Sequence, residues 1–350
     1  MSVPHTDRRR AVIEGFLLGV AIGDSVCLPY EGLSAARAGR RLDRKGLRQS
    51  LVGRWGMLSD DTEQTALVAQ SFLEAGANPR SLGRAFARRL RWWFLALPGG
   101  IGLATARACI KLCMGKAPEH SGVNSAGSGP AMRAGLLGLL VDDESLIACV
   151  RAITIPTHAD PRALQGALIV AVGARLAMTH GSGVSAAMVR QAVTDFAEAP
   201  DLREALEHAL SAAEHGETAT ALTDRLRLSG RVTGFVVHVV PVALYLWLRH
   251  TSNPERALEE AIRLGGDTDT VGSIAAGLIG AGAGPGAFPP ELAAGIADWP
   301  RSVRWLKSLA SRLAEGPPHP LSLFWPMIPL RNLVFIAIVV CHGLRRLIPL

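Results

Sequence analysis

The sequence predicts an all-α fold, and three observations support the prediction. Aromatic residues make up only 5% of the 350 residues, whereas glycine, with 37 residues, and alanine are abundant. Runs of β-branched residues are scarce, which suits closely packed helices better than a β-sandwich or a β-barrel. Apolar residues recur at helical spacing along the whole chain, without an internal repeat or a low-complexity linker. We therefore expect one all-α domain over residues 1–350.

The first helix is expected at residues 8–26, in the middle of a helical bundle. Gly15, Gly19 and Gly23 stand four residues apart on one of its faces. These glycines would weaken a solitary helix, but they allow the backbone of a second helix to approach closely. Pro29 follows and ends the helix, because proline disfavours a helical conformation in the residue before it.

The other helices are expected between segments rich in glycine, proline, asparagine and serine, which break helices. In order, they cover residues 62–74, 80–96, 102–112, 130–140, 161–178, 183–197, 232–247, 255–263, 269–280, 303–314 and 331–344. The main breaks lie at residues 76–79, 98–100, 115–129 and 282–290.

The composition excludes several classes of protein. With 49% hydrophobic and 19% charged residues, the chain can bury a large core, which excludes disorder, collagen and a small disulfide scaffold. The net charge is +7, but Lys and Arg are spread through helical patterns, so we expect solvated faces and no nucleic-acid partner. Five widely separated cysteines and no secretory leader predict reduced thiols in the cytoplasm.

Two apolar stretches resemble membrane segments. Residues 11–30 contain Glu14 and Asp24, and either would cost about 3 kcal/mol at a bilayer centre. The nine apolar residues from Leu333 to Cys341 span about 14 Å as a helix, half of a hydrocarbon core. We therefore expect a buried helix in a C-terminal extension, residues 317–350, that packs on the domain, and no membrane partner. A helix lying on a membrane surface is the alternative.

Two acidic clusters precede predicted helices. Residues 58–63 read Leu-Ser-Asp-Asp-Thr-Glu, and residues 265–270 read Gly-Gly-Asp-Thr-Asp-Thr. Taken singly, each is explained by helix capping, because Asp60 and Glu63 have the spacing of a capping box and carboxylates favour a helix N-terminus.

Taken together, the two clusters indicate a metal site. Asp60, Asp61, Asp267 and Asp269 crowd more negative charge at two helix ends than the helix dipoles need. If the two ends face each other, these carboxylates and two hydroxyls would hold two divalent cations, with Mg²⁺ or Mn²⁺ as the natural occupants.

Two further segments have features of a substrate site. Glu31 lies on a loop beyond Pro29, where a carboxylate can do acid/base work, although an exposed loop glutamate is the simpler explanation. Residues 122–133 form a glycine-rich loop that runs into a helix, and its free N–H groups suit a diphosphate. The loop is neither a Walker loop nor a dinucleotide fingerprint. His158, at a helix entry, is either a cap residue or a ligand contact.

These motifs, in this order, resemble those of the ADP-ribosylglycohydrolases. The resemblance covers roughly residues 8–283 and rests on residues 15–31, 59–62, 127–133, 157–158 and 265–270. The chain departs from the family pattern at Ala126, Ser128 and Pro130, where a polar or aromatic residue, asparagine and a small residue are more usual.

The resemblance implies an all-α domain with a binuclear Mg²⁺ or Mn²⁺ centre. It implies catalytic roles for Glu31 and Asp269, and a second role for Asp269 as a metal ligand. The other metal ligands that it implies are Ser59, Asp60, Asp61, Asp267 and Thr270. The diphosphate and ribose pocket that it implies consists of Asn124, Ser125, Ala126, Gly127, Ser128, Gly129 and His158.

The activity implied is hydrolysis of the bond at the anomeric carbon of the distal ribose, through a transition state with oxocarbenium character. The substrate expected is an ADP-ribosylated protein or a small ADP-ribose conjugate, and the protein is expected to be a monomer. The alternative is a non-catalytic ADP-ribose-binding protein, or an interaction protein that neutralises a toxin, on the same fold. All four carboxylates are present, which argues against the loss of catalysis.

Overall fold

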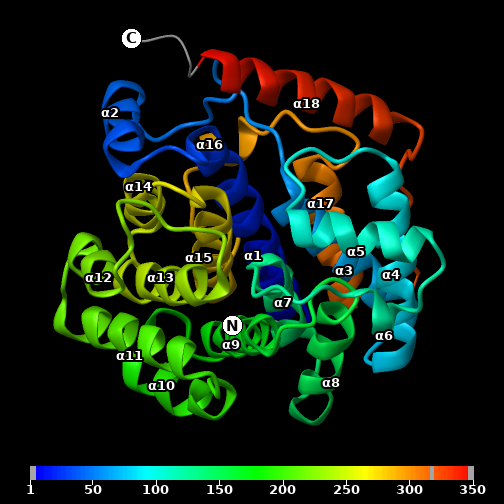
Figure 1. The fold of residues 1–350 in the computed structure, drawn as a ribbon, viewed down its shortest axis with the longest axis horizontal. Coiled ribbons are helices and arrows are strands. Elements are labelled where there is room, and N and C mark those ends of the chain that lie inside the picture. Colours follow the sequence, from blue (N-terminus) through cyan, green and yellow to red (C-terminus); the bar gives the residue numbers. More distant parts are fainter. Residues whose placement is uncertain (1–4, 316–318, 346–350) are drawn as a thin grey trace.

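The computed structural model describes residues 5–315 and 319–345, and it confirms the all-α prediction (Figure 1). In this part of the chain no β-sheet forms, and extended segments pair only through isolated bridges. The longer helices are α1 His5–Cys27, α2 Ala35–Lys45, α3 Asp60–Ala75, α4 Pro79–Leu95, α5 Leu103–Cys113, α7 Gly129–Leu140, α8 Asp143–Thr154, α9 Pro161–His180, α11 Pro200–His215, α13 Val236–Arg249, α14 Pro254–Leu264, α15 Thr268–Ala283, α17 Val303–Glu315 and α18 Met327–Arg345. The shorter ones are α6 Pro118–Ser121, α10 Ala186–Val193, α12 Ala219–Arg225, α16 Pro290–Ala294, and the 3₁₀ segments Leu28–Tyr30, Gly181–Gly183 and Thr194–Phe196.

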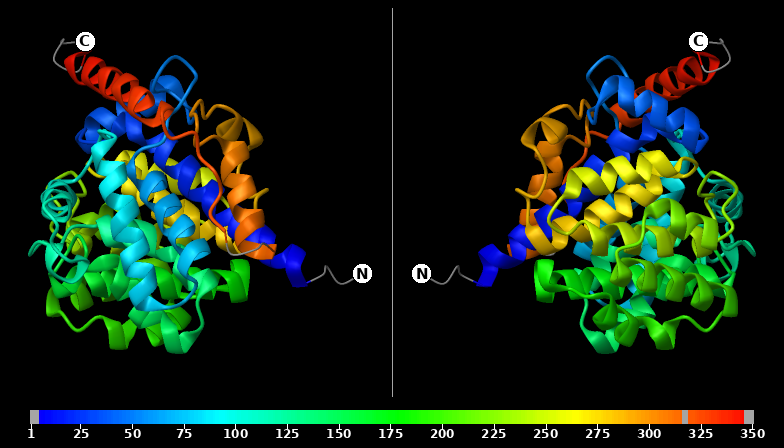
Figure 2. Two further views of the ribbon diagram at one scale, coloured as in Figure 1. Left: turned by 90° about the vertical axis from the view of Figure 1, so that its right-hand side faces the viewer. Right: turned by 90° about the vertical axis from the view of Figure 1, so that its left-hand side faces the viewer.

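Helices α1 and α15 pack against each other at the centre of the molecule (Figures 1 and 2). A Cβ atom added at Gly15, Gly19 or Gly23 would lie within 2.3 Å of a backbone oxygen of α15. The predicted close approach along the glycine face is therefore confirmed. Although α1 and α9 are long and apolar enough to cross a membrane by length and composition, 89% of the α1 segment is buried inside the protein.

The remaining helices build one large core around this pair and a second, smaller core beside it. The large core includes α7, α9, α11, α13 and α14, and the smaller one is formed mainly by α4, α5 and α8 against α7 and α9. Helices α3, α7 and α15 each bury a residue of their first two turns, Ala66, Ala131 and Val271, in the large core. The packing therefore holds these three helix ends in fixed positions.

Several helices differ from the sequence prediction. Helices α2, α8 and α11 were not predicted, and residues 183–197 form the short α10 between two 3₁₀ segments. Helix α13 begins at Val236, not at Val232, because Val232 pairs with the 265–267 backbone: its N–H donates to Gly265 and its carbonyl accepts from Asp267. This pairing keeps residues 232–235 extended.

The apolar C-terminal segment is the middle of the 19-residue helix α18, which begins at Met327, before the predicted start at residue 331, and ends at Arg345, next to the predicted end at residue 344. The length argument against a membrane helix is therefore wrong, because α18 is long and apolar enough to cross a bilayer by length and composition. Only one face of α18 is buried, and the opposite face is exposed. The predicted burial thus holds for one face alone. Residues 317–318 and 346–350 of the predicted extension lie outside the described residues.

Candidate active site

A pocket of about 510 Å³ opens where the N-terminal ends of α3 and α15 meet the loop before α7. Glu31, Asp60, Asp267, Asp269 and Thr270 line its acidic side. Asp61 lies behind them, where its carboxylate accepts hydrogen bonds from Ser273 (3.0 Å), Thr270 (3.4 Å) and Ser59 (3.4 Å). Since Thr270 and Ser273 belong to α15 and Asp61 to α3, the two acidic helix ends do face each other.

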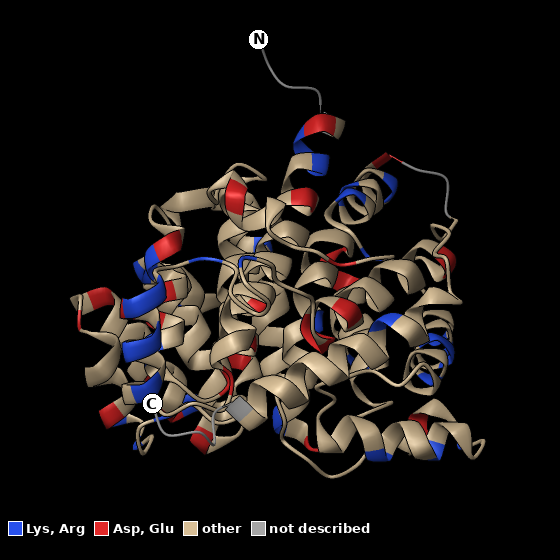
Figure 3. Cartoon of the chain, turned by 90° about the horizontal axis from the view of Figure 1, so that it is seen from above, with Lys and Arg blue, Asp and Glu red and all other residues tan. Residues whose placement is uncertain are grey.

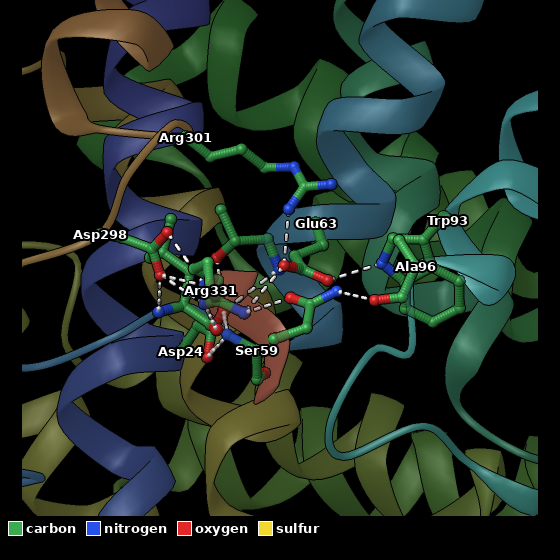
Figure 4. Close-up of polar contacts among 11 residues, drawn as sticks. Asp24, Ser59, Glu63, Trp93, Ala96, Asp298, Arg301 and Arg331 are labelled. Atoms are coloured by element: carbon green, nitrogen blue, oxygen red, sulfur yellow. Dashed lines mark hydrogen bonds and ion pairs between the residues drawn. The ribbon is translucent and has the colours of Figure 1, made fainter. Parts of the chain in front are cut away.

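Asp24 of α1 holds the N-terminus of α3 in place (Figure 4). Its buried carboxylate accepts the backbone N–H groups of Ser59 (2.9 Å) and Thr62 (3.2 Å), as well as the Thr62 hydroxyl. Burial raises the pKa of Asp24 to about 6, although these hydrogen bonds oppose the shift.

The predicted capping box between Asp60 and Glu63 is wrong. The buried Glu63 carboxylate accepts instead from Arg301 (2.7 Å), Arg331 (3.1 Å) and the Trp93 indole (Figure 4). The two arginines neutralise the negative charge of Glu63, which would be costly in the protein interior. The Glu63 carboxylate therefore binds Arg301 and Arg331 and does not cap the helix.

The acidic side of the pocket carries more negative charge than the protein compensates. Burial raises the pKa values of Asp60, Asp61, Asp267 and Asp269, and repulsion among the carboxylates adds to the shift for Asp60, Asp61 and Asp269. Asp269 Oδ1 is buried without a hydrogen-bond partner. A set of hard oxygen donors with surplus negative charge and an unpaired acceptor fits a divalent cation.

In the described ranges 5–315 and 319–345, no three His, Cys, Asp or Glu side chains are grouped so that they could hold a metal ion.

The opposite side of the pocket is the glycine-rich loop, which contributes Ser125, Gly127, Ser128 and Gly129. A Cβ atom added at Gly127 would lie 3.0 Å from His158 Nε2, and one added at Gly129 would lie 3.2 Å from His158 Cε1. The two glycines therefore allow the imidazole to stand directly against the loop.

His158 presents a neutral imidazole to this pocket. Its Nδ1 lies 2.8 Å from Thr157 Oγ1, and its Nε2 faces Gly127. The pKa of His158 is lowered to about 3. Burial is the largest cause, the positive charge of Arg133 adds to the shift, and the carboxylate of Asp160 opposes it. The ring is therefore uncharged at neutral pH.

Arg133, to which the sequence analysis assigned no role, ties the two sides of the pocket together. Its fully buried guanidinium donates to the Gln64 side chain of α3 (2.6 Å), the Gly129 carbonyl (3.0 Å) and Thr157 Oγ1 (2.6 Å). Burial lowers its pKa to about 9. An arginine among the apolar residues of α7 is the signal in the sequence that predicts such a link.

Four predicted residues lie outside the pocket wall, and two segments of the wall were missed. Ser59 and Asp61 are buried, and the Ser59 hydroxyl donates to the Asp61 carboxylate. Asn124 is exposed, and Ala126 is buried with its carbonyl accepting from the Val236 N–H (2.9 Å). The missed walls come from residues 100–105 and 231–234. The glycine-rich break at residues 98–100 is the only sequence feature that indicates the 100–105 segment. No sequence feature indicates the 231–234 segment.

The fold is all-α, and its pocket joins an acidic side to a glycine-rich loop. The family model described as ADP-ribosylglycohydrolase matches residues 5–320, and the chain belongs to this family. The resemblance found in the sequence motifs is thereby confirmed. Helix α18 lies beyond the matched residues.

The chain also resembles individual proteins. It is 30% identical over 319 residues to an uncharacterized protein of Archaeoglobus fulgidus, a match that covers 85% of this chain and 94% of that protein. It is 27% identical over 311 residues to the uncharacterized protein YegU of Escherichia coli K12, a match that covers 81% of this chain and 90% of YegU. A solved structure called an ADP-ribosylglycohydrolase-related protein complex shares the fold, with a TM-score of 0.66 and 24% sequence identity. The match covers 89% of this chain and 99% of that chain.

Proposed function

We propose that the protein is a metal-dependent hydrolase that releases ADP-ribose from an ADP-ribosylated protein or a small ADP-ribose conjugate. The bond cleaved is the one at the anomeric carbon of the distal ribose. The observation that carries the proposal is that one pocket joins two acidic helix ends to a glycine-rich loop that opens a third helix. This combination suits a substrate with a diphosphate at one end and a sugar at the other.

The metal site of this proposal consists of Ser59, Asp60, Asp61, Asp267, Asp269 and Thr270. It is supported by the unpaired Asp269 Oδ1 and by the raised pKa values of the buried carboxylates. Two divalent cations, Mg²⁺ or Mn²⁺, would supply Lewis acidity to the ribose hydroxyls and to the attacking water.

The substrate diphosphate is assigned to the loop before α7. The helix dipole of α7 favours an anion at this end. Pro130 has no N–H, and the N–H groups of Ser128 and Ala131 donate to the carbonyls of Gly234 (3.0 Å) and Ser128 (2.8 Å), so the proposal relies on the glycine-rich loop and the dipole more than on the first turn of the helix. Because His158 is neutral, it neither attracts nor repels the diphosphate and is left to orient the substrate by hydrogen bonding. The phosphates are thus held away from the carboxylates.

Glu31 is assigned to proton transfer at the reacting bond. It follows the short 3₁₀ segment Leu28–Tyr30, it is exposed, and it lines the pocket. Its charge contributes to the raised pKa values of both Asp60 and Asp269, which places the Glu31 carboxylate near the acidic side. A loop carboxylate in this position can accept a proton from water or return one to the leaving group.

The cytoplasm is the compartment we propose for this activity. All five cysteines are free, and Cys27, Cys109 and Cys149 are buried, as reduced thiols in a core would be.

The test is direct release of ADP-ribose from peptides modified on arginine or on serine, and from a small conjugate, with Mg²⁺ or Mn²⁺ added after chelation. We expect release from at least one substrate, and none in chelator. Glu31→Gln should slow single-turnover release about 10²-fold while ADP-ribose affinity stays within about threefold, and Glu255→Gln is the exposed control. A protein that binds ADP-ribose and cations but releases nothing would be the non-catalytic binding protein instead.

A further inference from the structure

Helix α18 has one apolar face that nothing in the structure covers. Leu330, Leu333, Val334, Val340 and Leu344 are each 50–58% exposed. They recur at intervals of three, four and seven residues, so they form one stripe along the helix. Helix α18 lies along one side of the molecule (Figures 1 and 2). Because these five side chains are exposed, the stripe faces away from the protein. An apolar stripe of this length indicates an interaction surface.

The inner face of α18 fixes the helix flat against the protein. Arg331 donates to Glu63 (3.1 Å), to Asp298 and to the Leu58 carbonyl (Figure 4). Asn332 donates to the Ala96 carbonyl (2.7 Å). If α18 left this position to cross a bilayer, Asp298 would lose its buried ion pair and Arg331 would enter hydrocarbon. The helix therefore offers its apolar stripe while remaining parallel to the surface of the protein.

A basic surface lies beside the C-terminal end of α18. Arg41 of α2 lies 3.5 Å from His342, whose Nε2 lies 2.6 Å from the Leu51 carbonyl. Helix α2 also exposes Arg40 and Arg44, and Figure 3 looks onto this side. Burial lowers the pKa of Lys45, and neighbouring arginines lower it further, as expected where positive charge is concentrated.

Aromatic side chains flank the stripe. Trp55 is 56% exposed on the turn next to Leu51, which itself packs on Phe335 of α18. Before the N-terminal end of α18, Phe324 and Trp325 are exposed and contact the rings of Trp299 and Trp92. Tryptophan favours the level of lipid headgroups, where its ring has one apolar and one polar side.

We propose that the outer face of α18, with the basic α2 and the exposed tryptophans beside it, docks the protein on the surface of a membrane with anionic lipids. An apolar stripe with adjacent arginines matches a bilayer that offers hydrocarbon and negative charge together. A second copy of the chain would bring the same positive charge to the contact, which opposes association. Docking of this kind goes beyond the hydrolase activity, because α18 lies outside the residues that match the family.

The test uses the full chain and sedimentation with vesicles, either of phosphatidylcholine alone or with one quarter of phosphatidylglycerol. We expect binding to the anionic vesicles at least about tenfold stronger than to the neutral ones, and weakening with salt. Alkaline carbonate should release the bound protein, because a docked helix does not span.

Matched variants separate the stripe from the basic surface. Val340→Asp and Leu333→Asp should each lower binding about tenfold or more, whereas Met114→Asp, at another exposed apolar residue, should not. The double change Arg40→Glu with Arg44→Glu should abolish the preference for anionic vesicles. The same double change at Arg80 and Arg84, exposed near the N-terminus of α4, should preserve it. Circular dichroism confirms that each variant is folded.

Four results would overturn the proposal. The first is equal binding to both kinds of vesicle, and the second is binding that neither stripe variant weakens. Another is self-association abolished by Leu333→Asp in a protein that does not bind vesicles, which would make a second copy the occupant. The last is retention on the vesicles after carbonate, which would make α18 a spanning anchor.

Discussion

The acidic side of the pocket depends on single carboxylates, and Asp269 is the clearest case. Its Oδ1 is buried and unpaired, and its pKa is raised by burial and then by Glu31, Asp61, Asp267 and Asp24. An unpaired buried oxygen costs stability, and the cation of the proposed metal site would offset that cost. Asp269 should therefore lower the stability of the protein without a cation and raise its stability when a cation is bound.

Asp269→Asn should raise the thermal stability of the metal-free protein, because it removes one of the mutually repelling charges. It should also remove most of the stabilisation that Mn²⁺ gives to the wild type, and lower Mn²⁺ affinity by about 10² or more. Thermal unfolding in chelator and across a Mn²⁺ titration measures both effects. Asp195→Asn, at an exposed position, is the control. A variant with undiminished Mn²⁺ stabilisation would exclude Asp269 as a ligand.

His158 predicts a specific dependence of stability on pH. Its pKa is about 3 in the folded protein and about 6.5 in the unfolded chain. Between these two values the imidazole is protonated in the unfolded chain and neutral in the folded protein. The neutral ring stabilises the fold above pH 6.5, and this stability is lost as the pH falls toward 3. Between pH 7 and 5 the loss is up to ~2 kcal/mol. Urea unfolding of His158→Gln in chelator should show a shallower fall than the wild type, and parallel curves would contradict the assignment.

Residue types and their spacing predicted the acidic clusters, but not the partners of each carboxylate. Asp60 and Glu63 have the spacing of a capping box, yet Glu63 turns to Arg301 and Arg331, which are more than 200 residues away in the sequence. Asp24 fixes the start of α3 instead. Contacts across such separations depend on packing, which local spacing does not encode.

At the scale of elements, the loop before α7 and the helix α18 each support the pocket. The loop is held by Arg133, and its glycines fit against His158. The inner face of α18 reaches Leu58, directly before Ser59, and also supports the 96–99 loop, where a Cβ added at Gly99 would lie 2.6 Å from the Phe335 ring. The described part of the C-terminal extension is thus continuous with the core.

Gly127→Val should weaken ADP-ribose binding about tenfold or more while Mn²⁺ affinity is retained. A Cβ atom there meets His158 at 3.0 Å, and the branched side chain would also fill the space assigned to the diphosphate. Calorimetry with ADP-ribose measures the loss. Gly183→Val is the matched control, because nothing lies within 4 Å of its Cβ position. Unchanged affinity in Gly127→Val would leave the loop as a connector only.

Arg331→Met should lower the free energy of unfolding by about 3–5 kcal/mol, because it leaves Asp298 buried without its cation. It should also lower Mn²⁺ affinity, since the Leu58 carbonyl before Ser59 loses its donor. Denaturant unfolding and calorimetry measure the two effects, with the exposed Arg304→Met as control. Arg331→Lys should recover part of both losses. A purely structural Arg331 would leave the Mn²⁺ affinity of the folded variant unchanged.

Periodicity predicted most of the long helices, but it missed α2, α8 and α11, although α11 has 16 residues and buries one apolar face. Helix α2 was missed because only Ala38 and Leu42 on it are buried among many arginines. The start of α13 was misplaced because pairing with the 265–267 backbone overrides helical propensity at Val232. Helix α18 was recognised and its C-terminal end was placed within one residue, but its start was put at Arg331, which is instead an interior, buried residue.

At the scale of the whole molecule, composition and periodicity were sufficient for the fold class, and five motifs in order were sufficient for the family. Composition, periodicity and motifs did not predict how the helices pack against one another. The pocket is assembled from segments that begin at residue 31 and end near residue 270, and the walls from 100–105 and 231–234 carry no recognisable motif. Only the packed structure brings them together.

The contact between α1 and α15 also has a consequence for how the chain is made. Gly15 meets Gly280, about 260 residues later, and a ribosome that adds ~5–20 residues per second needs roughly 13–50 s to cover that distance. During this time α1 is outside the ribosome with its apolar, glycine-lined face uncovered. We expect the nascent chain to remain a client of chaperones until α15 emerges, and N-terminal fragments that stop before α15 to aggregate. The central helix pair thus makes completion of synthesis a condition for folding.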